Sequence, residues 1–277
     1  MGAQSADYMI GHPETKTEPL SVLSHAFHPF TLRVLEEAGV EKGMRVLEIG
    51  SAGGDLALLA AEYVGPYGSV IGIETTPEAV SYGTRRALAS GIGNVSFVQA
   101  PLDQDWPFDP EFDVLVGRIV LMFLPSPAEA LRKLARQVKP GGLVIFQEPD
   151  MSWAKSVPNV PAVEKAANWM RAIFKISGAD SEFGPKLHAA FRDAGLPDPV
   201  MRVDGLIYGS SGAGPSLLAE TIRTILPAME QFGIANTREV DINTLEDRMR
   251  AQLESANASM SSPLLVSAWS RDPNRIR

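Results

Sequence analysis

The sequence predicts an α/β fold built on a doubly wound, largely parallel sheet. Short apolar runs rich in β-branched residues, first at 44–49 and again at 69–74, alternate with stretches of helical periodicity. The first run ends in a turn of small residues, 50–54, which opens directly into the helix-forming stretch 56–62. Such a turn lets backbone amides approach a ligand without side-chain interference, so we expect a ligand site here.

The composition narrows the classes of partner. The 277 residues include 33 acidic and 25 basic side chains, and the net charge of −8 argues against nucleic acid or an anionic membrane as the partner. The absence of cysteine excludes thiolate catalysis and cysteine-based metal sites. Residues 1–19 lack the apolar region of a signal peptide, and no run approaches the ~20 apolar residues of a transmembrane helix. We therefore expect a cytoplasmic protein, and its oligomeric state stays open.

The predicted elements follow in a regular order. Residues 1–38 form an N-terminal arm and a helical preface, whose helical period from Pro19 to Ala38 is interrupted near Pro29, so we expect two short helices there. The core extends over 39–150. Its further elements are strands at 69–74, 94–98, 112–121 and 143–148, and helices at 77–90 and 127–138.

The turn at 50–54 fits some ligands better than others. A dinucleotide fingerprint would need glycine at three positions where the chain has Gly50, Ala52 and Asp55. A phosphate-binding P-loop would need a lysine, but no Lys or Arg occurs between Arg45 and Arg85. The turn is acidic, which suits a ligand with positive groups. S-adenosylmethionine, with a sulfonium and an α-ammonium group, is such a ligand.

Three motifs carry a family resemblance. Glu48-x-Gly50-x-Ala52-x-Gly54 resembles the first motif of class I S-adenosylmethionine-dependent methyltransferases, with Ala in place of the middle glycine. The run from Phe112 to Arg118 and the helix-Lys-Pro-Gly-Gly-strand passage at 139–142 are also similar to this family, most closely to its ubiquinone- and menaquinone-biosynthesis type. The resemblance implies a Rossmann-like sheet of seven strands, the seventh antiparallel, and S-adenosyl-L-methionine as cofactor, with S-adenosyl-L-homocysteine as product.

The same resemblance implies the cofactor site. Glu74 ends the second strand, 26 residues after Glu48, and would accept the ribose hydroxyls. Pro101 stands where relatives carry an adenine-binding acid, so Asp103 or a backbone carbonyl would take that place. Arg118 could hold the cofactor carboxylate, bind an acid group of the substrate, or form a structural ion pair. The expected cofactor-binding set is Glu48, Gly50, Ser51, Ala52, Gly54, Glu74, Thr75, Leu102, Asp103, Gly117 and Arg118. Asp103 and Asp105 are interpreted as solvated acids, so no metal site is expected.

Beyond residue 150 the pattern departs from the family. We expect a cap insertion at 151–183, a core helix and strand six at 184–208, a second cap insertion at 209–262, and strand seven with a tail at 263–277. The two insertions would meet as one helical cap over the crevice. Aromatic residues of the cap suit an apolar, planar acceptor, although they could equally form the core of the cap. The expected substrate-binding residues are Trp153, Trp169, Phe174 and Tyr208.

Methyl transfer depends mainly on positioning, so no universal catalytic residue is required. Candidate bases are His25, His28, Tyr8 and Glu148, each of which could instead pack or cap its element. We therefore expect a methyltransferase acting on a C, O or N nucleophile of an aromatic or lipophilic small molecule, in secondary metabolism. The alternatives are an S-adenosylmethionine-binding protein without transferase activity and, disfavoured by the glycine spacing, a nicotinamide oxidoreductase.

Overall fold

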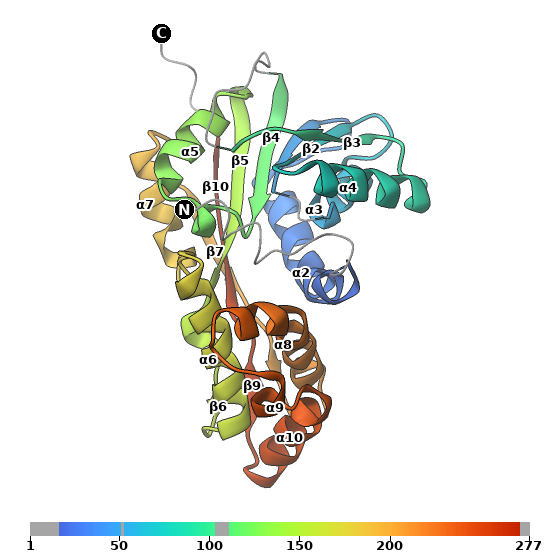
Figure 1. Cartoon of the computed structure of the whole chain (residues 1–277). Helices are drawn as coiled ribbons and strands as arrows, with labels where there is room; N and C mark the ends of the chain where they lie inside the picture. Colours follow the sequence, from blue (N-terminus) through green and yellow to red (C-terminus); the bar gives the residue numbers. More distant parts are fainter. Residues whose placement is uncertain (1–16, 51–52, 103–110, 272–277) are drawn as a thin grey trace.

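Seven strands form one open sheet in the order β3-β2-β1-β4-β5-β10-β7 (Figure 1). The computed structural model describes residues 17–50, 53–102 and 111–271, with only the backbone for 17–25. The neighbouring pairs among β1 to β5 are parallel, whereas β10 runs antiparallel to both β5 and β7. This confirms the predicted doubly wound sheet with its antiparallel seventh strand. The strands are β1 Arg45–Ile49, β2 Ser69–Glu74, β3 Val95–Gln99, β4 Phe112–Arg118, β5 Val138–Asp150, β7 Val200–Asp204 and β10 Leu264–Arg271.

Helices cover both faces of this sheet because its strands are apolar on both sides. Along β4, Val114 and Val116 join one buried cluster, and Leu115 joins another. The first face is covered by α2 Thr17–Ala38, α3 Asp55–Val64 and α4 Pro77–Ser90, and the second by α5 Pro127–Ala135 and α7 Leu187–Asp193. Among the described residues, three short 3₁₀ helices join the elements: η1 Leu121–Phe123, η2 Met151–Trp153 and η3 Gly184–Lys186.

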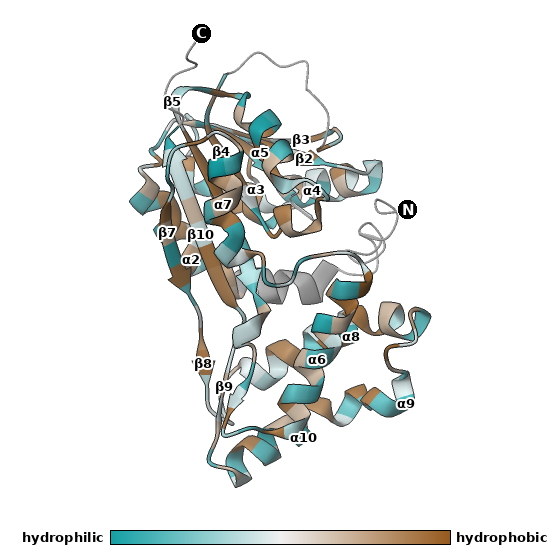
Figure 2. Cartoon of the chain, turned by 90° about the vertical axis from the view of Figure 1, so that its left-hand side faces the viewer, coloured by the Kyte–Doolittle hydropathy of each residue, from teal (hydrophilic) through white to brown (hydrophobic). Residues whose placement is uncertain are grey.

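A second group of elements, which we call the helical unit, lies beyond the carboxyl ends of the parallel strands (Figure 1). It contains α6 Pro161–Ile176, α8 Gly214–Gln231, α9 Thr237–Val240 and α10 Ile242–Ser255, with a small sheet of β6 Ser156–Val157, β9 Ser259–Ser261 and β8 Ile207–Tyr208. The helices alternate hydrophobic and hydrophilic residues (Figure 2). Residues that precede β7 in the sequence, such as Trp169, and residues that follow it, such as Met229, belong to the same buried cluster.

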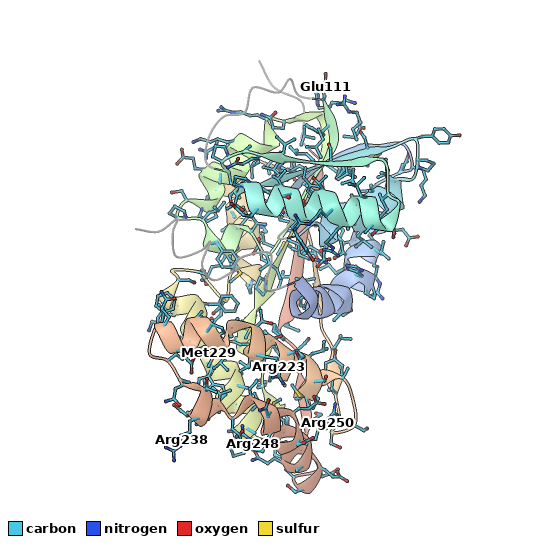
Figure 3. The ribbon with its side chains drawn as sticks, turned by 45° about the vertical axis from the view of Figure 1, so that its right-hand side comes forward. Glu111, Arg223, Met229, Arg238, Arg248 and Arg250 are labelled. Carbon is cyan, nitrogen blue, oxygen red and sulfur yellow. The ribbon has the colours of Figure 1, made fainter. Side chains whose placement is uncertain are left out.

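The helical unit extends the molecule away from the large sheet. Figure 3 shows Arg238 and Arg248 at its far end and Glu111, which pairs with Arg45 at the amino ends of β1 and β4, at the opposite end of the molecule. The chain enters the unit after β5 and leaves it after α6 to form α7 and β7. It enters again after β7 and returns to the large sheet at β10. In addition, α2 contacts α8, so the N-terminal helix lies between the sheet and the unit. Ligands of open α/β sheets bind at this carboxyl edge.

The N-terminal preface differs from its prediction. A single helix, α2, continues through Pro29, where two short helices were expected. Proline removes one backbone hydrogen bond, but the helix buries Phe27, Phe30 and Val34 along one face, both before and after Pro29. Packing along the whole helix therefore outweighs the missing hydrogen bond.

Two later strand boundaries were also wrong. β5 begins at Val138, and the Lys-Pro-Gly-Gly stretch lies inside it as an irregularity in the pairing with β4. The predicted sixth strand stops at Asp204, and its last part, Ile207–Tyr208, pairs with β9 in the small sheet. In the region predicted as the second cap insertion, 209–262, the last helix ends at Ser255 and Ser259–Ser261 forms β9. No helix within the described ranges is both long and apolar enough to cross a membrane.

Candidate functional site

The turn after β1 has left-handed backbone at three described glycines, Gly50, Gly53 and Gly54. Gly50 has φ of 70° and its N–H donates to the carbonyl of Ile73 at 3.0 Å. Gly54 precedes α3 with φ of 87°, and a Cβ there would lie 2.9 Å from Cζ of Phe97. The turn therefore brings bare backbone to the N-terminus of α3. Ser51 and Ala52, two further predicted cofactor residues, lie outside the described residues.

Glu74 meets this turn from the end of β2. Its side chain is buried, and Oε1 accepts the N–H of Gly53 at 3.4 Å. Burial raises the pKa of Glu74 to about 7, against the lowering effect of the Gly53 hydrogen bond. A carboxylate held at this point against the turn can accept hydroxyl groups of a ligand. Thr75 follows, and its carbonyl accepts the side-chain amide of Gln99 at 3.1 Å.

Charged groups of both signs gather beside the turn. Glu48 on β1 is 1% exposed, and its Oε2 lies 3.3 Å from where a Cβ on Gly72 would be. Asp55 opens α3 and pairs with Arg86 at 2.5 Å. Burial lowers the pKa of Arg118, at the end of β4, to about 10, while the charges of Asp55 and Glu48 act in the opposite direction. The site thus holds two cations, Arg86 and Arg118, and two anions, Glu48 and Asp55, of which Asp55 is paired with Arg86.

Arg118 also reaches a residue that the sequence analysis missed. Its Nη1 donates to Oγ1 of Thr31 on α2 at 3.1 Å. Thr31 is 1% exposed and lies among the apolar positions of α2 that face the sheet. A polar residue on the apolar face of a predicted helix is the signal that could have identified it.

Glu148, one of the candidate bases, is occupied by backbone groups. Its carboxylate is fully buried at the end of β5 and accepts the N–H groups of Val120 at 3.0 Å, Leu121 at 2.8 Å and Met122 at 3.4 Å. Burial raises its pKa to about 7, although these three hydrogen bonds lower it. This geometry favours a role in holding the segment after β4 over the role of a base.

The other predicted residues at the sheet have varied surroundings. Gly117 is in tight contact with Phe146, because a Cβ there would lie 2.4 Å from the ring, so packing alone requires this glycine. Leu102 is partly buried and packs against the apolar cluster on the sheet face that α5 and α7 cover, which we call the cluster of the α5 face. His28 is partly buried on α2. The side chain of His25, and all of Tyr8, Asp103 and Asp105, lie outside the described residues.

The four predicted substrate residues also differ in their surroundings. Trp169 is 6% exposed and belongs to the core of the helical unit, which is the alternative that the sequence left open. Tyr208 packs against the backbone of Gly212 and Gly214. Trp153 is 49% exposed, with Nζ of Lys155 4.6 Å from its ring centroid.

Phe174 lies where the helical unit meets the sheet. Its ring centroid is 6.4 Å from that of Phe123 in η1, in a tilted arrangement. Both rings pack against the core of the helical unit and against the cluster of the α5 face. Because η1 follows β4 directly, this aromatic pair joins the two parts of the protein close to the carboxyl edge of the sheet.

Comparison with known proteins adds to this geometry. The family model described as "Methyltransferase domain" matches residues 40–190. The ubiquinone/menaquinone biosynthesis C-methyltransferase UbiE of Ectopseudomonas mendocina is 38% identical over 130 residues, 46% of this chain and 50% of that protein. The chain thus spans about half the length of this curated relative.

Two solved structures share the fold. The YcgJ protein from Bacillus subtilis has a TM-score of 0.56 and 20% identity, over 90% of this chain and 99% of that one. Phosphoethanolamine N-methyltransferase 2 from Haemonchus contortus, solved with phosphomonomethylethanolamine and S-adenosylhomocysteine, has a TM-score of 0.57 and 13% identity, over 95% of this chain and 59% of that one.

Proposed function

The chain belongs to the methyltransferase-domain family of S-adenosylmethionine-dependent enzymes, and on this premise we propose that it transfers a methyl group from S-adenosylmethionine to a small molecule. The acceptor is an aromatic or lipophilic compound that presents a C, O or N nucleophile. The protein is proposed to act in the cytoplasm. Its net charge of −8 supports a small-molecule acceptor over nucleic acid.

The observation that carries this proposal is the contact of Glu74 with the turn at Gly53. A buried carboxylate at the end of β2, beside a turn of bare backbone, supports this proposal because such a group could accept both hydroxyls of a ribose. The cation Arg118, flanked by Glu48 and Asp55, supports an amino-acid group nearby, since a carboxylate and an ammonium are complementary to such a cluster.

The reaction is an in-line displacement. The nucleophile of the acceptor attacks the methyl carbon while the bond between that carbon and sulfur breaks. The electron pair of the broken bond stays on sulfur, and the leaving group is the neutral thioether S-adenosylhomocysteine. The protein holds donor and acceptor in line and excludes water. His28, His25 and Tyr8 are the proposed groups that receive a proton from an oxygen or nitrogen nucleophile.

The acceptor is proposed to lie at the edge where the sheet meets the helical unit. Phe123 and Phe174 supply aromatic surface there, and Trp153 adds an exposed ring at the base of the unit. The curated relative is named for quinone biosynthesis, but its similarity covers only 46% of this chain. Since the helical unit lies largely outside the matched family region, we propose a different acceptor, from secondary metabolism.

Calorimetric titration with S-adenosylmethionine, S-adenosylhomocysteine and NAD tests the donor site. Micromolar binding of the first two compounds and none of NAD is expected. Glu74→Ala should weaken binding by roughly 1–3 kcal/mol through the lost hydrogen bonds, with Glu78→Ala on exposed α4 as the control. Binding of NAD alone would contradict the proposal. Donor binding without methyl transfer to any aromatic acceptor in a broad panel would favour a binding protein without transferase activity.

A further inference from the structure

Three polar side chains form a row across adjacent strands beneath α2. Arg118 on β4 lies in register with Gln147 on β5, and Gln147 lies in register with Ser267 on β10. Gln147 and Ser267 are fully buried. Residues on either side of them in the same strands, such as Ile145 and Trp269, are apolar and pack beneath α2 and α3. A polar row inside an apolar face requires a compensating set of hydrogen bonds.

Thr31 of α2 completes the row from above. Its hydroxyl donates to Oε1 of Gln147 at 2.7 Å, and the amide of Gln147 donates to Oγ of Ser267 at 2.8 Å. With its only proton used on Gln147, the Thr31 oxygen can only accept on its remaining side. Nη1 of Arg118 donates to it there at 3.1 Å. The direction of every hydrogen bond in the row therefore depends on the next one.

The backbone after Arg118 is held by the same glutamine. The N–H of Ile119 donates to the carbonyl of Gln147 at 2.8 Å. Ile119 has φ of 60°, a left-handed conformation that β-branched residues rarely adopt. Strained backbone of this kind persists where the surroundings determine it, and it clusters at functional sites. Gln147 thus fixes Arg118 twice, once through the backbone and once through Thr31.

The position of Thr31 is itself fixed by ion pairs farther along α2. Arg33 pairs with Asp204 of β7 at 3.2 Å, and Glu37 pairs with Arg202 of the same strand at 2.7 Å. Arg202 lies in register with Ser267, so these pairs continue the row to the edge of the sheet. The helix cannot shift along its axis without breaking several of these contacts.

We propose that Thr31 is a positioning residue that orients the Arg118 guanidinium toward the carboxylate of the amino-acid part of the methyl donor. Glu48, whose charge acts on Arg118, favours the neighbouring ammonium group, whereas Asp55 is paired with Arg86. This inference rests on the proposed function. It assigns the N-terminal helix a part in donor recognition that neither Glu74 nor the glycine turn provides.

The test compares two ligands that differ only in this part of the donor. S-adenosylhomocysteine carries the amino-acid group, whereas 5′-methylthioadenosine keeps the nucleoside and the thioether without it. Affinities of the full-length protein are measured by calorimetry for the wild type, Thr31→Val, Thr31→Ser and Arg118→Met. Thr84→Val is the matched control, because its hydroxyl bonds to a carbonyl of its own exposed helix.

Thr31→Val and Arg118→Met should each weaken S-adenosylhomocysteine binding about tenfold, and leave 5′-methylthioadenosine within about twofold. Thr31→Ser should restore the wild-type ratio, and Thr31→Val should add no further loss to Arg118→Met. If Thr31→Val fails to fold, Thr31→Ala serves the same comparison.

Equal weakening of both ligands, or no change for either, would overturn the inference while leaving the proposed function intact. A wild-type protein that binds neither ligand would overturn both.

Discussion

Oε1 of Glu148 accepts the backbone N–H of Leu121 at 2.8 Å, deep between the sheet and the segment that leaves β4. The carboxylate has no exposed surface, and burial raises its pKa to about 7. One side chain at the end of β5 therefore orders the start of η1, which carries Phe123 toward the helical unit.

This contact predicts how stability depends on pH. The folded protein keeps a proton on Glu148 up to about pH 7, whereas the unfolded chain releases it near its ordinary value of 4.5. Between these values the folded state binds more protons, so the free energy of unfolding falls as pH rises. Glu148→Gln should lack the share of this fall that Glu148 contributes, on the order of 2–3 kcal/mol, and keep the share of Glu74, whose pKa is also about 7. Urea unfolding at pH 5 and pH 7.5 measures it, with exposed Glu129→Gln as control. Parallel profiles for wild type and Glu148→Gln would contradict the assignment.

Glu74 predicts a pH dependence of donor affinity. Only the ionised carboxylate accepts two hydroxyl protons, and its pKa in the free protein is about 7. Affinity for S-adenosylhomocysteine should therefore fall by up to about tenfold per pH unit below 7, and level off above it. Glu74→Gln should bind weakly at all pH values and show no such slope. The measurement is the affinity for S-adenosylhomocysteine by calorimetry from pH 5.5 to 8.5. An affinity of the wild type that does not change with pH would exclude an ionised Glu74 in the complex.

Gly54 predicts a destabilisation larger than backbone strain alone. Gly54→Ala adds a Cβ 2.9 Å from Phe97 at a φ of 87°. Gly91→Ala is the matched control, because Gly91 has φ of 68° but no atom within 4 Å of its added Cβ. We expect about 1 kcal/mol for Gly91→Ala and about 2–4 kcal/mol for Gly54→Ala in chemical denaturation. Equal losses of unfolding free energy in the two variants would show that the Phe97 ring moves aside without destabilising the protein.

The Phe123 and Phe174 pair predicts an energetic coupling between sheet and helical unit. In a double-mutant cycle with Phe123→Leu and Phe174→Leu, the coupling should be about 0.5–1.5 kcal/mol. A second cycle of Phe123→Leu with Ile176→Ala, an exposed residue of the same helix, should give none. Additive losses in the first cycle would mean that the rings do not stabilise the junction.

Sequence patterns predicted the elements whose signals are local. β2 and α4 have the predicted boundaries, since an apolar strand ends at Glu74 and a proline begins the helix at Pro77. The helix through Pro29 and the change of sheet after Asp204 depend on distant packing, which periodicity does not record.

The candidate site also has one part that local sequence patterns predicted and one part that they did not. The glycine turn and Glu74 lie within one βαβ unit, so their spacing was informative. The Thr31 row joins residues 116 and 120 positions apart, and only the register of β4, β5 and β10 brings them together. No motif of contiguous residues contains that relationship.

The connection between the helical unit and the large sheet has a mechanical consequence. Asp150, where β5 ends, is paired with Leu264 of β10, and the next residue, Leu265, is paired with Asp204 at the end of β7. The strands β5, β7 and β10 therefore connect to the helical unit at neighbouring points. Rotation of the unit would bend these strands about one narrow axis, and the contact of α8 with α2 would open or close at the other side. Such a rotation would leave the glycine turn and Glu74 in place, because β1, β2 and α3 carry none of these connections.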